Sequence, residues 1–142
     1  MFGAFPMILI AVVLYNLAVL GLMVGGQHDA AALLGQKFSI KMASGDLWTV
    51  SLADIFILLG LGLLFVETIK ATRTTAREIL NHAFSMLTFV AALVEFILLK
   101  GFATSTFFLI TCMCLFDVVA GYTISIVAAR RDLVAAEVEH TH

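Results

Sequence analysis

Two acidic residues lie deep inside apolar stretches of this chain, where a charged side chain needs a partner or a task. Asp117 is near the middle of the apolar run over residues 105–129, and Glu95 lies well inside the preceding run. If these runs cross a bilayer as helices, a carboxyl group at such depth costs about 2.5–3.5 kcal/mol. Acids of this kind mark proton or ion pathways, or in protonated form donate a structural hydrogen bond between helices. They are the first candidates for chemistry.

Other polar side chains recur at depths that would bring them near these acids. Asn16, Thr88 and Asp117 all lie near the midpoints of apolar runs, so we predict that they form an intramembrane cluster. Tyr15 is a further possible donor to Asp117. At 100° per residue, one face of the third apolar run carries a stripe of polar or small residues: Asn81, Ser85, Thr88, Ala92 and Glu95.

Two further polar groups are expected nearer the membrane surfaces. They are an outer acidic pair, Asp54 and Glu95, and an inner polar group, Glu67, Lys70 and His82. Each has a structural interpretation as well. The pattern Ser51-x-x-Asp54 is typical of a helix capping box, and Lys70 follows Glu67 at a spacing that allows an ion pair on one helix.

Known catalytic motifs are absent from the sequence. It contains no H-E-x-x-H, G-x-S-x-G, P-loop or C-x-x-C pattern. Cys112 and Cys114 stand two residues apart, where helical side chains point in different directions and cannot readily form a disulfide. His82 is the single histidine within an apolar run, which excludes a bis-histidine haem within one chain. We therefore expect no enzyme activity, no cofactor and no metal site.

The composition is that of an integral membrane protein. Hydrophobic residues make up 62% of the chain and charged residues 13%, whereas soluble domains average about 45–50% and about 25%. A spanning helix needs about 20 residues, so four helices fit into the 142-residue chain. We predict an all-α membrane protein, a single domain over residues 1–142 built as a four-transmembrane-helix bundle. Its helices are expected at residues 5–25, 52–71, 78–99 and 105–129, followed by a cytoplasmic tail at 132–142.

The outer segment, residues 27–50, has a different pattern. Apolar and polar residues alternate from Lys37 to Met42, turn residues follow at 43–46, and strand formers occupy 47–50. This pattern predicts a short β-hairpin with Phe38, Ile40 and Met42 on one face, and Trp48 at the outer membrane–water boundary. An irregular loop lying on the bilayer is the alternative.

The distribution of basic residues predicts the orientation in the membrane. Cytoplasmic loops carry an excess of Lys and Arg. Five of the eight basic residues fall on one predicted side, namely Lys70, Arg73, Arg77, Arg130 and Arg131, with Lys37, Lys41 and Lys100 on the other. This places both termini in the cytoplasm. The net charge of −2, without a long basic block, argues against nucleic acid as a partner.

The chain resembles a group of small, uncharacterised four-span inner-membrane proteins of bacteria in two stretches. These are Gly45-Asp-Leu-Trp-Thr-Val-Ser-Leu-Ala-Asp54 and the stretch from Phe102 through Ile110 to Asp117. The resemblance implies an integral protein of the bacterial inner (cytoplasmic) membrane. It implies no activity and no functional residue.

Three functions remain open at this point. The first is a non-enzymatic membrane protein that is surrounded by the lipid bilayer and forms homo-oligomers or joins other membrane protein subunits. The second is a small proton-coupled carrier or pore that uses Asp117 and Glu95 as protonation sites. The third is an enzyme acting on lipid or quinone at the outer face, with Asp54, Glu95 and Trp48.

Overall fold

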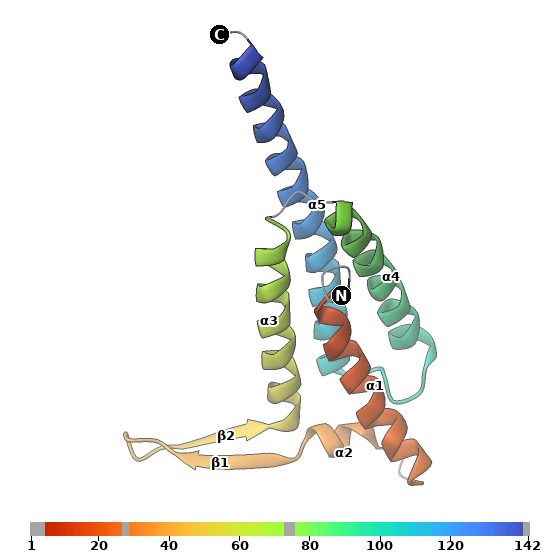
Figure 1. Ribbon diagram of the computed structural model, residues 1–142. Coiled ribbons are helices and arrows are strands. Elements are labelled where there is room, and N and C mark those ends of the chain that lie inside the picture. The colour runs from red at the N-terminus through yellow and green to blue at the C-terminus, as the bar shows by residue number, and fades with distance from the viewer. Residues whose placement is uncertain (1–4, 27–28, 73–75, 141–142) are drawn as a thin grey trace.

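The computed structural model describes residues 5–26, 29–72 and 76–140, and 74% of the chain is helical (Figure 1). Across these residues there are five helices and one antiparallel two-stranded hairpin. In chain order the elements are α1 (Ile8–Val24), α2 (Ala30–Leu34), β1 (Lys37–Lys41), β2 (Leu47–Ser51), α3 (Leu52–Lys70), α4 (Ala76–Leu98) and α5 (Ser105–His140). Predictions that concern residues 1–4, 27–28, 73–75 and 141–142, including the loop residue Arg73, lie outside the described residues.

Three described helices are long and apolar enough to cross a membrane. These segments are Leu52–Lys70, Leu80–Leu98 and Ser105–Ala135. The apolar helix α1 has only 17 residues. At about 1.5 Å per residue it is roughly 25 Å long, shorter than a hydrocarbon core of about 30 Å. Three helices thus have the length and apolar composition that a membrane crossing needs, and the four-helix membrane bundle stays a prediction.

Two differences from the predicted elements concern the chain outside the spans. The residues expected to form a separate tail continue α5 as far as His140, so that α5 projects well beyond the ends of α3 and α4 (Figure 1). The outer segment also contains the short helix α2, which was not predicted. Asp29 caps α2, because its carboxylate accepts a hydrogen bond from the backbone N–H of Ala32 at 3.0 Å.

Helix α5 occupies the centre of the bundle and contacts α1, α3 and α4 (Figure 1). The core is built around Tyr15 of α1, which is fully buried. Its ring lies 4.7 Å from that of Phe107 in α5 and 5.5 Å from that of Phe56 in α3, measured between centroids. Aromatic pairs at such distances contribute packing beyond their buried area, so Tyr15 joins three helices.

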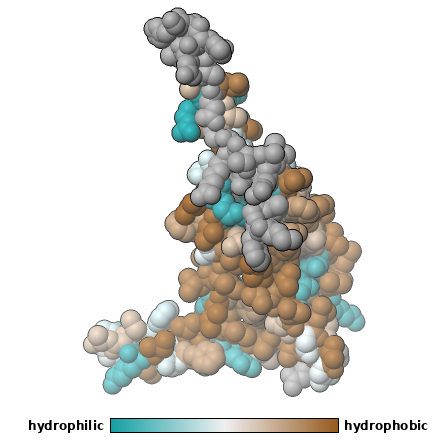
Figure 2. Space-filling model, viewed as in Figure 1, coloured by the Kyte–Doolittle hydropathy of each residue, from teal (hydrophilic) through white to brown (hydrophobic). Residues whose placement is uncertain are grey.

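The outward faces of the bundle are apolar. Leu17, Leu58 and Phe65 are each more than 60% exposed, on α1 and α3. Figure 2 shows hydrophobic residues covering most of the visible face of the bundle. A soluble protein rarely leaves so much contiguous apolar surface uncovered, whereas acyl chains cover such a surface in a bilayer.

The predicted β-hairpin is present. Phe38 pairs with Val50 and Ile40 with Trp48, so these four side chains share one face of the ladder, which Met42 continues. Gly45 has φ of 95°, a conformation that suits glycine in the tight turn between the strands. The hairpin extends sideways from the base of α3, at a large angle to the helices (Figure 1). The position of Trp48 at a membrane boundary stays a prediction.

Glycines allow two close approaches of helices to α5. A Cβ atom at Gly121 would lie 2.5 Å from Nδ1 of His82, and one at Gly60 would lie 2.7 Å from Sδ of Met113. Neither distance is compatible with a real side chain. In lipid, where apolar burial does not drive helix association, small residues of this kind permit close packing. Gly121 therefore determines how closely α4 packs against α5.

We predict that Gly121→Ala lowers the free energy of unfolding by about 1–3 kcal/mol, because the new methyl group displaces the His82 ring. The measurement is a titration with denaturing detergent in mixed micelles, followed by circular dichroism. Gly62→Ala is the matched control, since nothing lies within 4 Å of a Cβ atom there. Adding His82→Ala to Gly121→Ala should make the two losses less than additive. Fully additive losses would contradict the contact.

Candidate functional site

The most connected polar side chain in the bundle is Glu67, near the end of α3. It is 1% exposed, and its carboxylate accepts hydrogen bonds from three directions. The backbone N–H of Met7, at the start of α1, donates to Oε2 at 2.6 Å, and Lys70 Nζ donates to Oε1 at 3.2 Å. Asn81 Nδ2, from α4, donates to Oε1. One carboxylate therefore joins α1, α3 and α4.

Local sequence explains why these donors meet. Glu67 and Lys70 stand one turn apart on α3, which places both on one face of that helix. The first N–H groups of a helix have no partner inside it and carry the positive end of the helix dipole, so they bind a carboxylate well. Lys70 Nζ also donates to the carbonyl of Phe5 at 3.2 Å. The start of α1 is thus held by both members of the ion pair.

The predicted inner polar group is only partly brought together. Glu67 and Lys70 form an ion pair, but the structure joins His82 to α5 instead. Its Nε2 lies 2.8 Å from Oγ of Ser125, and its ring lies 5.4 Å from that of Tyr122. The reason is rotation along α4, because His82 follows Asn81 and so points about 100° away from it.

Asp117 lies in the same buried region. It is 3% exposed, on α5, and interacts with the side chain of Ser85, whose hydroxyl group donates to the Asn81 carbonyl at 3.1 Å. Ser85 stands one turn after Asn81 on α4, so the polar stripe predicted for this helix does face the acids of its neighbours. The polar network therefore consists of the buried residues Glu67, Asn81, Ser85 and Asp117 together with the partly exposed Lys70.

In the structure, Asn16, Thr88 and Tyr15, the residues predicted to cluster with Asp117, make hydrogen bonds to other groups. Asn16 Nδ2 donates to Glu95 Oε2 at 2.9 Å and to the Val12 carbonyl at 3.0 Å. Tyr15 and Thr88 make other hydrogen bonds. Tyr15 Oη and Thr104 Oγ1 lie 2.5 Å apart, and Thr88 Oγ1 donates to the Phe84 carbonyl at 2.8 Å.

The physical reason is an axial offset of α1. The prediction assumed that the midpoints of all spans lie at one depth. However, Met7 at the start of α1 shares Glu67 with Asn81, which already lies inside α4. Helix α1 is therefore displaced toward the hairpin end, and its polar residue meets Glu95 rather than Asp117.

The two residues of the predicted outer acidic pair have separate partners. Asp54 is exposed and completes the predicted capping box, because its carboxylate accepts from the backbone N–H of Ser51 at 2.8 Å while the Ser51 hydroxyl accepts from the Asp54 N–H at 3.2 Å. Glu95 is half-buried and accepts from Asn16. Asp54 thus caps the first turn of α3, and Glu95 joins α4 to α1.

Two buried oxygen atoms of the network have no hydrogen-bond partner among the described residues. They are Oδ1 of Asn81 and Oδ2 of Asp117. Buried polar atoms are nearly always paired in native proteins, so an unpaired acceptor indicates a missing donor. A protonated carboxyl group is itself a donor. A carboxyl group with an unpartnered oxygen atom can take up a proton, and this is the chemistry that Asp117 offers.

Sequence reasoning missed two of the pairings in this region. Helical spacing places Asn81 on the polar stripe but does not indicate its partner, and it does not single out Ser125. The available signal was spacing, because Asp117, Gly121 and Ser125 follow one another at four-residue intervals on one face of α5.

Within residues 5–26, 29–72 and 76–140, no three His, Cys, Asp or Glu side chains are grouped so that they could hold a metal ion. Cys112 and Cys114 are both free thiols.

Comparisons of the chain with protein families, curated proteins and solved structures found no match.

We predict that Glu67→Gln lowers the free energy of unfolding by about 2–3 kcal/mol, because it removes the ionic partner of Lys70 and weakens the bond to the Met7 N–H. Detergent unfolding in mixed micelles provides the measurement. Asp46→Asn is the control, since Asp46 is an exposed acid in the hairpin turn and its loss should change stability by less than about 0.5 kcal/mol. Equal stability of the two variants would mean that Glu67 does not hold α1 in place.

Proposed function

We propose that this chain is a non-enzymatic integral membrane protein that assembles with copies of itself or with other membrane protein subunits. The proposal includes insertion as a four-helix bundle in the bacterial inner membrane, with α1 as the short fourth crossing and both termini in the cytoplasm. The observation that carries the assembly role is the end of α5, which leaves the bundle with apolar side chains uncovered.

The length of α5 supports this role. Its 36 residues extend for roughly 54 Å at about 1.5 Å per residue, far more than a hydrocarbon core of about 30 Å. Arg130 and Arg131 mark the end of its apolar part. Beyond them, Leu133 is 69% exposed and Val134 60% exposed. A short helical segment without tertiary contacts is marginally stable in water, so a packing partner would stabilise it.

The spacing of these residues suits a helical partner. Leu133 stands seven residues after Ile126, and Val134 seven after Val127, so each pair shares a face of the helix. All four side chains are more than half exposed. They form two apolar patches, one on each side of Arg130 and Arg131, and a second copy of α5 would present the same patches and could pack against them.

The hairpin offers a second surface at the opposite end of the molecule. Phe38 and Trp48, on its apolar face, are each 56% exposed. An isolated two-stranded hairpin is at best marginally stable in water. A neighbouring subunit or the membrane interface would cover this face. The hairpin extends sideways from the start of α3, so it would lie over a subunit or lipids next to α3 (Figure 1).

The test is native mass spectrometry of the full chain in a mild detergent, which should show oligomers or co-purifying membrane subunits. Substituting both Leu133→Ser and Val134→Ser should reduce the assembled fraction several-fold by removing apolar contact area. Ala135→Ser is the matched control, because this exposed residue lies on the opposite face of α5 from Leu133. A strictly monomeric parent chain without associated protein would refute the assembly role.

A small proton-coupled carrier or pore is the second candidate. It is favoured by the unpartnered Oδ2 of buried Asp117 beside Ser85. Intramembrane acids that exchange protons form the relays of pumps and transporters. Glu95, the other acid of this proposal, belongs to the separate pair with Asn16.

For this candidate, Asp117→Asn should abolish proton flux in proteoliposomes driven by a pH gradient, while circular dichroism shows an intact fold. Asp117→Glu, which keeps a carboxyl group, should retain measurable flux. Absence of flux in the parent chain, or flux unchanged by Asp117→Asn, would eliminate the carrier.

A further inference from the structure

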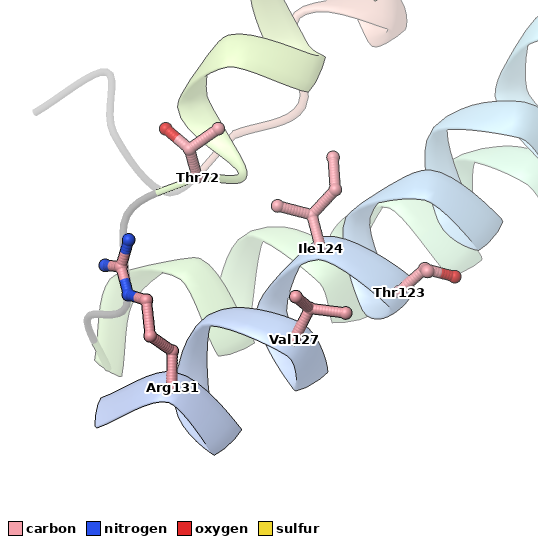
Figure 3. Close-up of a pocket in the computed structure, with 5 residues that line it drawn as sticks. All are labelled: Thr72, Thr123, Ile124, Val127 and Arg131. Carbon is pink, nitrogen blue, oxygen red and sulfur yellow. The ribbon is translucent and has the colours of Figure 1, made fainter. Parts of the chain in front are cut away.

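A pocket opens between the end of α3 and the part of α5 that leaves the bundle. Its volume is about 290 Å³, and five residues line it (Figure 3): Thr72, Thr123, Ile124, Val127 and Arg131. In Figure 3 the Arg131 side chain extends from α5 toward Thr72, while Ile124 and Val127 project into the space beside it. The pocket therefore combines one cationic group with an apolar wall.

Its position along α5 matches a membrane boundary. Val127 still belongs to the apolar part of α5, and Arg131 stands one turn further, on the same face and beyond the apolar part. Lys70 ends α3 at the same end of the bundle, and Arg130 adjoins Arg131. This end of the bundle thus places basic groups where phospholipid headgroups would lie.

Among the described lining residues, Arg131 is the one that can donate hydrogen bonds to a ligand. Thr72 Oγ1 donates to the Ile69 carbonyl at 2.8 Å, and Thr123 Oγ1 donates to the Val119 carbonyl at 2.7 Å. Both hydroxyl groups therefore already donate their protons to groups within the chain. Arg131 also has an interaction inside the protein, and its planar guanidinium group carries five N–H donors, so it can contact a ligand and a protein group together.

We propose that this pocket binds the phosphate group of an anionic phospholipid, with Arg131 as the donor and one acyl chain lying against Ile124 and Val127. The inference rests on the proposed insertion in a membrane. The planar guanidinium fork matches the geometry of phosphate oxygens, and basic pockets between helices at the cytoplasmic side bind anionic headgroups. A volume of about 290 Å³ suits the headgroup region, while the acyl chains remain in the bilayer.

The test is native mass spectrometry of the full chain in mild detergent, titrated with dihexanoyl phosphatidylglycerol, dihexanoyl phosphatidylcholine or inorganic phosphate. Phosphatidylglycerol should bind more tightly than phosphatidylcholine, and inorganic phosphate should not displace it, because it lacks an acyl chain. Arg131→Gln should weaken binding about tenfold, the effect of losing a charge-assisted hydrogen bond. Val127→Trp should block binding without changing the charge.

Arg130→Gln is the matched control, since Arg130 carries the same charge but does not line the pocket. It should leave the affinity within about twofold of the parent, a difference of about 0.4 kcal/mol. The proposal is overturned if Arg130→Gln and Arg131→Gln weaken binding equally, if Val127→Trp has no effect, or if inorganic phosphate competes. Circular dichroism of each variant confirms folding.

Failure of this inference is distinguishable from failure of the proposed function. Lipid adducts are counted separately on monomers and on oligomers, so a monomeric chain can still carry the lipid. Membrane insertion itself is tested by alkaline carbonate extraction of the chain expressed in bacteria. Release of the chain by carbonate would refute insertion, whereas retention together with absent lipid adducts would refute only the pocket.

Discussion

A buried carboxylate inside an apolar bundle must be surrounded by donors, and Glu67 meets this constraint by drawing three segments together. The Met7 N–H, the Lys70 ammonium and the Asn81 amide all point at one carboxylate. Hydrogen bonds to a charged group are about twice as strong as those between neutral groups, and they act over short distances. The start of α1 is therefore held at a defined level against α3 and α4.

The axial position of α1 along the bundle determines how the remaining polar groups pair. Because α1 begins beside Asn81, its polar residue Asn16 lies opposite Glu95. Asp117 is left to the side of the bundle formed by α4 and α5, next to Ser85. The two acids that first stood out in the sequence thus belong to different neighbourhoods. Glu95 accepts a hydrogen bond that joins α4 to α1, whereas Oδ2 of Asp117 has no donor among the described residues.

Features determined by neighbouring residues could be predicted from the sequence, whereas those determined by helix offset could not. The capping box of Ser51 and Asp54 depends on residues three apart, and the hairpin depends on alternation around a turn that needs Gly45. The three long apolar helices followed from composition and length. The partners of Asn16 depend on the axial position of α1, which no periodicity within α1 contains. Continuation of α5 beyond Arg131 was missed because its residues are polar enough to suggest a tail.

The short length of α1 has a consequence for the surrounding lipid. Its 17 residues begin at Ile8, well inside the level at which α4 begins, and Lys70 reaches in to the carbonyl of Phe5. In a bilayer, a hydrophobic segment shorter than the hydrocarbon is accommodated by local thinning, at a cost of a fraction of a kcal/mol per Å of mismatch. If α1 crosses the bilayer, the leaflet beside its start would therefore be thinner than the lipid beside the longer helices α3, α4 and α5.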